Sequence, residues 1–91
     1  MADIDVRQTN AFLRAYKKLH NNQKDAVDQA IADIVIDPDI GEPKKGDLAG
    51  VYVHKFKCVQ QLYLLAYEFD PTTRTLLLVG THENFYRNLK R

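Results

Sequence analysis

The nine residues QLYLLAYEF, from Gln61 to Phe69, place apolar side chains on both faces of an extended chain. Successive side chains of a strand point to opposite faces of its sheet, so a strand that is apolar at nearly every position is buried on both sides. This segment is therefore expected to be the central strand of a sheet, with the other elements arranged around it.

Two further segments predict strands on either side of it in the sequence. Residues Val51–Lys57 alternate between apolar and polar side chains, and Thr75–Thr81 form a second apolar run. Between the last two strands lies DPTTR, a turn in which Pro71 presets the backbone angle φ. Three consecutive strands with short turns are expected to pair antiparallel.

The N-terminal half predicts one short strand followed by two helices. Ile4–Thr9 alternates as a strand does, and Asn10 and Asn22 are candidate caps of the two helices. Prolines and a glycine then end the second helix, so Pro38–Gly50 is expected to be a loop. The apolar residues repeat at helical spacing and should share one face: Phe12, Tyr16 and Leu19 in the first helix, and Val27, Ala30, Ile31, Ile34 and Val35 in the second.

The chain ends in GTHENFYRNLKR, which predicts a short helix over residues 84–90 with Asn84 as its cap. The complete pattern indicates one α+β domain over residues 1–91. In it, an N-terminal strand and a helix hairpin pack on a small, mainly antiparallel sheet, and a short C-terminal helix follows. The core is expected to join five helix residues to the central strand: Phe12, Leu19, Val27, Ile31 and Ile34.

The composition of the chain excludes several classes of protein function. A single cysteine, Cys58, cannot form an intramolecular disulfide, and no apolar run approaches the ~20 residues that cross a bilayer, so a cytoplasmic protein without membrane contact is expected. The chain has no serine, which excludes a serine nucleophile. No CxxC motif and no histidine pair at helical ligand spacing occur, so we expect no metal and no cofactor.

Charge is unevenly distributed along the chain. Residues 1–43 hold five basic and eight acidic residues, whereas residues 44–91 hold eight basic and four acidic ones, for net charges of −3 and +4. The cationic half could attract a polyanion. Scattered lysines on a solvated surface explain the same numbers, and the overall pI of 7.9 is modest for a nucleic-acid-binding domain.

The strand Val51–Lys57 places two lysines on one face, because Lys55 and Lys57 are two residues apart. His54 points to the opposite face. Lysines of this kind guard an exposed sheet edge against aggregation, or they form a ridge of fixed cations that binds phosphate.

His82 follows the last apolar strand, and Tyr86 lies four residues further on. Histidine at a strand end is commonly just an exposed polar residue, yet its ordinary pKa suits it to proton transfer at neutral pH. If the C-terminal segment is helical, Tyr86 can face the same cleft as His82 and stack on a base, or it can merely flank Phe85 and Leu89 where these dock the helix.

Several of these segments together resemble the RelE/ParE superfamily of bacterial toxins. The similarity rests on PDIGEPKKGDLAGVYVHKFK, on LYLLAYEF and on the ending GTHENFYRNLKR, which is similar to the ending of ribosome-dependent mRNA interferases, including the YafQ and HigB branches. It covers essentially the whole chain and implies the RelE-like fold.

The resemblance implies a toxin that cuts mRNA on the ribosome and is neutralised by a cognate antitoxin in a hetero-oligomer. Cleavage in this class needs no metal, because the ribose 2′-hydroxyl attacks the adjacent phosphorus. The implied catalytic residues are His82, Tyr86, Lys55 and Lys57. The implied substrate-binding residues are Lys44, Lys45, His54 and Arg87.

One position departs from the family pattern. Many members carry an arginine in a stretch like YRLIY, where this chain has Leu64 in YLLAY. Charge stabilisation of the phosphate must then come from the lysines or from Arg87. Two other functions therefore stay open, namely a ParE-like inhibitor of DNA gyrase without nuclease chemistry, and a degenerate toxin that retains only antitoxin binding.

Overall fold

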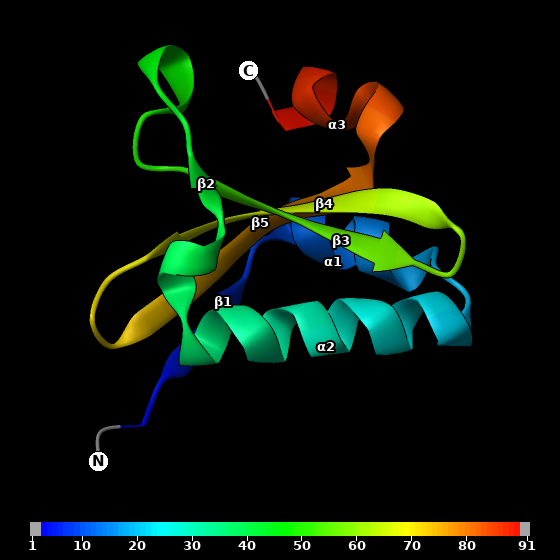
Figure 1. Ribbon diagram of the computed structural model, residues 1–91, viewed down its shortest axis with the longest axis horizontal. Helices are drawn as coiled ribbons and strands as arrows, with labels where there is room; N and C mark the ends of the chain where they lie inside the picture. The colour runs from blue at the N-terminus through cyan, green and yellow to red at the C-terminus, as the bar shows by residue number, and fades with distance from the viewer. Residues whose placement is uncertain (1–2, 90–91) are drawn as a thin grey trace.

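A five-stranded sheet forms the middle of the molecule. The computed structural model describes residues 3–89, apart from the side chains of Asn84 and Asn88. The strands are β1 (Asp5–Gln8), β2 (Glu42–Pro43), β3 (Tyr52–Cys58), β4 (Gln61–Phe69) and β5 (Thr73–Thr81), in the spatial order β1-β5-β4-β3-β2 (Figure 1). The predicted central strand is therefore β4, with the bounds that its apolar run indicated.

Strand pairing follows the expected pattern for the three long strands. β3 pairs antiparallel with β4, and β4 with β5. β1 pairs parallel with β5, so the sheet is mixed at one edge. At the other edge, the short β2 pairs with β3 only at Val53 and Tyr52. Consequently Lys55 and Lys57 lie where β3 is itself the edge of the sheet.

Two helices, α1 (Asn10–Lys17) and α2 (Asn21–Ile36), form the predicted hairpin, but their caps were assigned wrongly from sequence. The cap of α1 is Thr9, whose hydroxyl accepts from the Phe12 N–H at 3.2 Å and donates to the Leu77 carbonyl at 2.9 Å. The cap of α2 is His20, whose N–H donates to the Gln23 side chain at 2.8 Å. Thr9 therefore also ties α1 to β5, a contact that the local pattern around Asn10 does not reveal.

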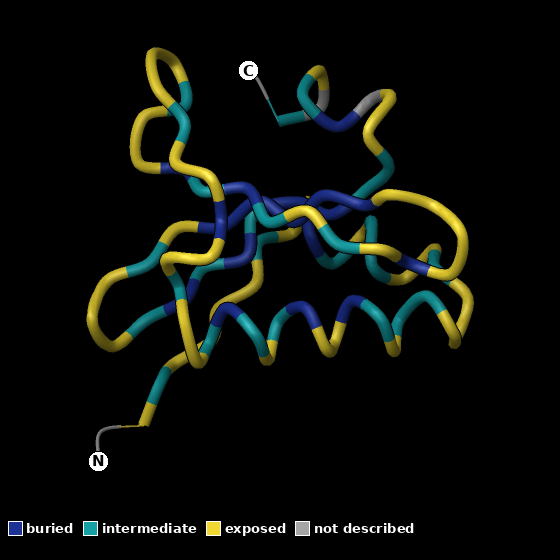
Figure 2. Tube along the Cα trace, viewed as in Figure 1, coloured by how far each residue is buried: buried dark blue, intermediate teal, exposed yellow. Residues whose placement is uncertain are grey.

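The helix hairpin covers one face of the sheet, as predicted. In Figure 1, α2 runs below the strands, and Figure 2 shows the buried positions concentrated in the strands and on the inner side of α2. Phe12, Val27 and Ile34 are fully buried, while Leu19 and Ile31 are partly buried against the same cluster. On the sheet side the cluster contains Tyr63, Leu65, Tyr67, Leu76 and Val79.

The opposite face carries a second apolar cluster and the C-terminal helix. α3 spans His82–Leu89, so it begins two residues before the predicted Asn84 start, and His82 is its first residue rather than the end of a strand. Phe85 is buried against β3, β4 and β5, beside Val53, Leu64, Ala66 and Leu78. The predicted residue 90 lies outside the described part of the chain.

The segment between α2 and β3 is more ordered than the predicted loop over Pro38–Gly50. It contains the two 3₁₀ turns η1 (Pro38–Ile40) and η2 (Gly46–Leu48) as well as β2. The buried Tyr67 hydroxyl donates to the Pro38 carbonyl at 2.6 Å and accepts from the Gly41 N–H at 3.0 Å. A Cβ at Gly41 would collide with that hydroxyl, so only glycine fits there. β4 therefore holds the segment that carries Lys44.

Candidate functional site

Lys55 and Lys57 lie on the face of the sheet that α3 occupies. Lys55 is directly opposite Leu64 and Lys57 opposite Leu62, and residues paired in this way share a face. Leu64 belongs to the cluster under Phe85. Both lysines are exposed and project from a rigid strand, as the prediction of a cationic ridge requires.

His82 and Tyr86 occupy successive turns of α3. Their rings meet edge to face with centroids 6.4 Å apart, and the Tyr86 ring also meets Phe85 edge to face at 5.3 Å. Helical spacing of four residues places both on one side of α3. Phe85 is buried against the sheet, and this contact fixes how α3 is rotated about its own axis. His82 is exposed, and Tyr86 is half-buried.

The register of the sheet brings His82 and the lysines to the same region. Thr81, directly before His82, is opposite Tyr63 on β4, and the adjacent Leu62 is opposite Lys57 on β3. Thr81 and Phe56, the β3 residue opposite Tyr63, are therefore separated by two strand spacings, or about 10 Å, and His82 begins α3 directly after Thr81.

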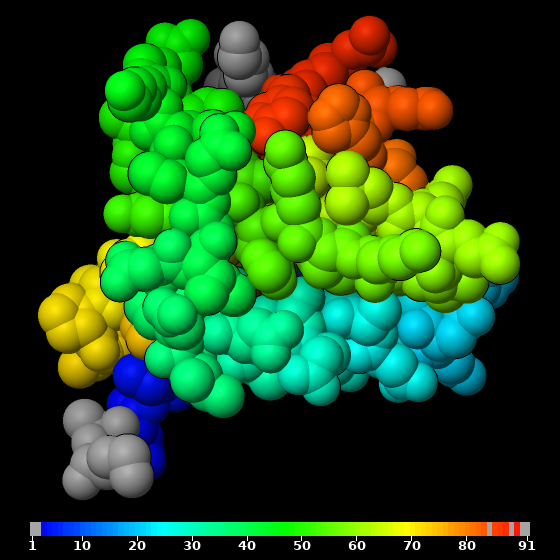
Figure 3. All heavy atoms as spheres, in the orientation of Figure 1, coloured from blue at the N-terminus to red at the C-terminus, as the bar shows by residue number. Residues whose placement is uncertain are grey.

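Lys44 joins this group from the segment before β3, whereas Lys45 does not. The Lys44 Nζ lies 5.1 Å from the centre of the Tyr86 ring and 2.9 Å from Glu42 Oε1. Lys45 is exposed at the start of η2. Figure 3 shows the segment around Lys44 and α3 rising from the same side of the molecule. We call Lys44, Lys55, Lys57, His82 and Tyr86 the basic face.

Electrostatic coupling links Glu42 on β2 to Lys44, which directly follows that strand, and to Lys55 on β3. The hydrogen bond from Lys44 and its charge, together with the charge of Lys55, lower the pKa of Glu42. Contacts with Tyr86 and then with Glu42 raise the pKa of Lys44, so its amine carries a full charge at neutral pH. Glu42 therefore lies within the field of both lysines and remains ionised.

The structure separates two of the predicted substrate-binding residues from the basic face. His54 lies on the helix-hairpin face, where it stacks on Phe56 with centroids 5.9 Å apart. Burial lowers the pKa of His54, and the charge of Asp33 on α2 partly opposes this shift. Arg87 is exposed on α3, about 200° around the helix axis from Phe85, so it points away from the sheet.

Leu64 occupies the position for which the family resemblance implies an arginine. Its side chain is completely buried in the cluster of Val53, Ala66 and Phe85. Leu64 supplies no charge to the neighbouring basic face, although it is directly opposite Lys55.

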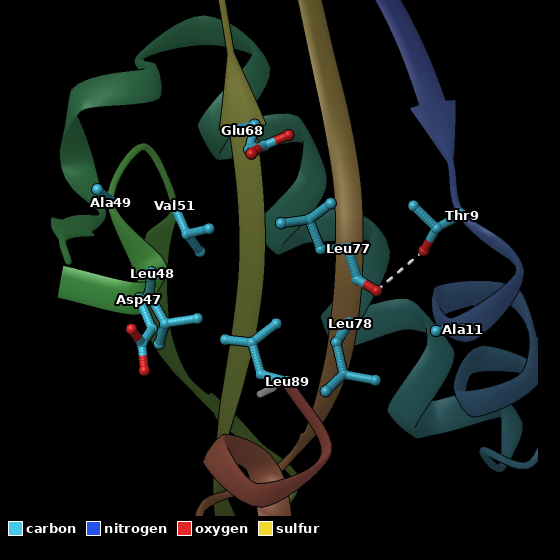
Figure 4. Close-up of a pocket in the computed structure, with 10 residues that line it drawn as sticks. All are labelled: Thr9, Ala11, Asp47, Leu48, Ala49, Val51, Glu68, Leu77, Leu78 and Leu89. Carbon is cyan, nitrogen blue, oxygen red and sulfur yellow. Dashed lines mark hydrogen bonds between the residues drawn. The ribbon is translucent and has the colours of Figure 1, made fainter. Parts of the chain in front are cut away.

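A cavity of about 550 Å³ lies beside the basic face, toward the C-terminal end of α3 (Figure 4). None of the eight residues predicted to form the site lines this cavity. Its wall is mixed, with aliphatic side chains, two carboxylates and exposed polar atoms, and consists of Thr9, Ala11, Asp47, Leu48, Ala49, Val51, Glu68, Leu77, Leu78 and Leu89.

Within residues 3–89, no three histidine, cysteine, aspartate or glutamate side chains gather closely enough to hold a metal ion. In the same part of the chain, no helix combines the length and apolar character needed to cross a membrane. Cys58 is fully buried, and burial raises the pKa of its thiol, which disfavours the nucleophilic thiolate.

Sequence reasoning missed Glu42 and Tyr67 as parts of this arrangement. Glu42 and Lys44 are two residues apart in an extended segment, a spacing that places opposite charges on one side and could have revealed the pair. Tyr67 reaches Pro38 and Gly41 across more than 25 positions. No local pattern in the sequence predicts such a contact.

Solved structures of bacterial toxins share this architecture. RelBE2, a toxin–antitoxin complex of Mycobacterium tuberculosis, contains a chain with a TM-score of 0.75 and 28% identity, with 89% of this chain and 100% of that chain covered. The RelE chain of the Escherichia coli RelBE complex gives a TM-score of 0.70 at 18% identity, with 88% of this chain and 98% of that chain covered. The isolated E. coli RelE toxin gives 0.68 at 20% identity, with coverages of 88% and 85%. No curated relative matches the sequence. The fold is thus that of the RelE toxins.

A family model identifies the chain more specifically. The model of the ParE-like toxin of type II bacterial toxin–antitoxin systems matches residues 6–90. The chain belongs to this family and is the toxin component of a type II toxin–antitoxin system. The family resemblance and the α+β fold with a short C-terminal helix, both expected from the sequence, are confirmed.

Proposed function

We propose that this toxin is a ribosome-dependent mRNA endonuclease, which acts in the cytoplasm and cleaves without a metal ion. One observation carries the proposal: a histidine, a tyrosine and several lysines project from rigid elements on the same side of the sheet. A surface that only binds another protein does not need a titratable group held beside fixed cations.

Cleavage in this scheme is a displacement at phosphorus within one nucleotide. The 2′-oxygen forms a bond to phosphorus as its proton leaves to a base, and the bond to the 5′-oxygen breaks as that oxygen takes a proton. The products are a cyclic phosphate and a free 5′-hydroxyl. His82 is proposed to act as the acid or the base in this exchange.

The other residues of the basic face have proposed roles that follow from their positions. Lys55 and Lys57 stabilise the negative charge of the pentacovalent phosphate, and Tyr86 orients the nucleotide. Lys45 and Arg87, both exposed, add to the attraction for the RNA backbone. His54 has no role in the proposal, because the sheet lies between it and His82.

The partner that neutralises the toxin is proposed to be a cognate antitoxin that covers the basic face in a hetero-oligomer. The support is that structures similar to this chain include the toxin–antitoxin complexes RelBE2 and RelBE. The ribosome and mRNA are the proposed partners of the free toxin.

A second candidate function is inhibition of DNA gyrase without nuclease chemistry. The observation that favours it is Leu64, a fully buried leucine where the nuclease pattern implies arginine. The two functions use the same fold, so they differ only in what the exposed side chains do.

Expression of the toxin without its antitoxin, followed by mapping of cellular mRNA 5′-ends, tests the proposal. The endonuclease produces codon-dependent cuts within translated mRNA. Intact mRNA with induction of the DNA-damage response would instead support gyrase inhibition. Normal growth with both mRNA and DNA intact would indicate a degenerate toxin that only binds antitoxin.

A further inference from the structure

Lys44 and Lys45 are neighbours in sequence, but the structure gives them different surroundings. The Lys44 side chain is only 19% exposed, and its amine is held between Glu42 Oε1 at 2.9 Å and the Tyr86 ring, whose centre is 5.1 Å away. Lys45 is exposed. The charge of Lys44 is therefore already paired within the protein.

The backbone that carries Lys44 is fixed from two sides. Its N–H donates to the Val51 carbonyl at 2.9 Å, which extends the pairing of β2 with β3 by one step. On the other side, the Tyr67 hydroxyl holds the segment through Pro38 and Gly41. The amine is thus presented to α3 from a rigid support.

The half-buried Tyr86 ring is contacted from the sheet, from within α3 and from the segment that carries Lys44. The ring packs against the second apolar cluster and meets Phe85 and His82 edge to face. Lys44 supplies a contact from outside α3, and a cation near an aromatic ring attracts it.

We propose that Lys44 is a positioning residue, which holds the Tyr86 ring in place beside His82 and does not itself bind the substrate. The proposal rests on the proposed function, in which Tyr86 orients the nucleotide. The two adjacent lysines then have different roles, since Lys45 binds the RNA backbone and Lys44 acts through Tyr86.

The first test uses the full chain without RNA. Lys44→Met removes the amine but keeps a long apolar stem, and Lys45→Met is the matched control with the same change in charge. Nuclear Overhauser contacts between the Tyr86 and Phe85 rings, with the Tyr86 signals assigned by Tyr86→Phe, report the ring position. We expect them to weaken in Lys44→Met and to persist in Lys45→Met. Unchanged contacts in Lys44→Met would overturn the proposal.

The second test measures RNA cleavage on programmed ribosomes and binding of a single-stranded RNA at several salt concentrations. Loss of one phosphate contact lowers the salt slope of binding by about 1, and we expect this for Lys45→Met. Lys44→Met should keep the slope and lower the cleavage rate about tenfold or more, because a displaced nucleotide reacts slowly. In a Tyr86→Ala background, Lys44→Met should have no further effect on cleavage.

A lower salt slope for Lys44→Met, equal to that of Lys45→Met, would show that Lys44 binds the RNA backbone and would overturn the proposal. Additive effects of Lys44→Met and Tyr86→Ala would overturn it as well. If the parent protein neither binds nor cleaves RNA, the proposed function fails. The Overhauser comparison then decides by itself whether Lys44 positions Tyr86.

Discussion

Arg74 on β5 is a buried cation that forms no ion pair with a carboxylate among residues 3–89. Its guanidinium donates to the carbonyls of Ile34 at 3.1 Å, Val35 at 3.1 Å and Asp70 at 2.8 Å, and it lies over the Phe69 ring. Two of these carbonyls belong to the last turn of α2, whose acceptors have no partner within the helix. Arg74 therefore fastens the end of α2 to the sheet.

Replacing Arg74 by methionine should lower the free energy of unfolding by about 3 kcal/mol, because buried carbonyl groups lose their donors. Chemical denaturation measures this loss, and Arg14→Met at an exposed position of α1 is the control. Arg74→Lys should recover little, since a single amine cannot reach all the carbonyls. A loss no greater than that of Arg14→Met would show that Arg74 does not fasten α2.

His54 makes folding stability depend on pH. Burial lowers its pKa in the folded state, so the unfolded chain binds the proton more readily. The contribution of His54 is therefore complete above its ordinary pKa and is lost as the pH falls through the lowered value. Denaturation curves between pH 7.5 and pH 5.5 should show a smaller pH dependence for His54→Gln than for the parent chain. Equal dependence in the two proteins would contradict the account of His54.

At the scale of residues, the sequence predicts which neighbouring side chains share a face better than it predicts their distant contacts. Lys55 and Lys57 share a face because strand geometry is local. Arg74, by contrast, read as part of a polar turn, and its burial depends on the end of α2, about 40 positions away. Partners at such distances are set by packing and leave no local pattern.

α3 is held on the sheet by Phe85, and Leu64 forms part of the surface beneath it. Gly80 lies near the ring, but an added Cβ there would be 4.0 Å from Phe85, an ordinary contact, so the approach of α3 depends on the apolar surface and not on this glycine. The position of the proposed catalytic residues thus depends on an apolar contact. An arginine at residue 64 would have to be buried or would push α3 away.

Leu64→Arg, which restores the family pattern, should therefore weaken the protein rather than activate it. We expect the free energy of unfolding to fall by about 3 kcal/mol or more, since the new charge has no partner under Phe85. Leu62→Arg is the control, because Leu62 lies on the same face but is 47% exposed. Denaturation and a cleavage assay measure the two effects. A stable Leu64→Arg protein with higher activity would refute this view of the α3 contact.

At the scale of elements, the sequence predicted most accurately the helices and strands in which one apolar pattern extends over many residues. β4 and α2 follow from long apolar patterns, and their approximate bounds were confirmed. The missed elements are short: β2 has two residues and the 3₁₀ turns have three each. Such elements are held in place by Tyr67 and by pairing with β3, so their own residues show little pattern from which they could be predicted.

The whole molecule divides into an acidic half, which includes the helix hairpin, and a cationic half. The net charges of residues 1–43 and 44–91 are −3 and +4, and all five residues of the basic face belong to the second half. Charges at the rim of an interface steer association and are screened by salt. An acidic antitoxin segment would therefore meet the basic face first.

We expect the association rate with the antitoxin to fall as salt increases. The double variant Lys55→Gln, Lys57→Gln should reduce this salt dependence, because it removes exposed charges without disturbing the core. Kinetic binding measurements at several ionic strengths provide the comparison. A rate that is independent of salt, or an interface confined to the helix hairpin, would contradict this account.

The central claim is that His82 transfers a proton during ribosome-dependent cleavage of mRNA. His82→Gln keeps a polar side chain of similar size but cannot titrate near neutral pH. His20→Gln, at the start of α2, removes a histidine that lies outside the basic face. Both variants should fold and bind antitoxin as the parent does.

The deciding measurement is the single-turnover rate of mRNA cleavage on purified programmed ribosomes. We expect His82→Gln to be slower by about 10²–10⁴-fold, the usual contribution of a positioned acid or base, and His20→Gln to match the parent. A His82→Gln protein that cleaves at the parental rate with the same cut pattern would contradict the account.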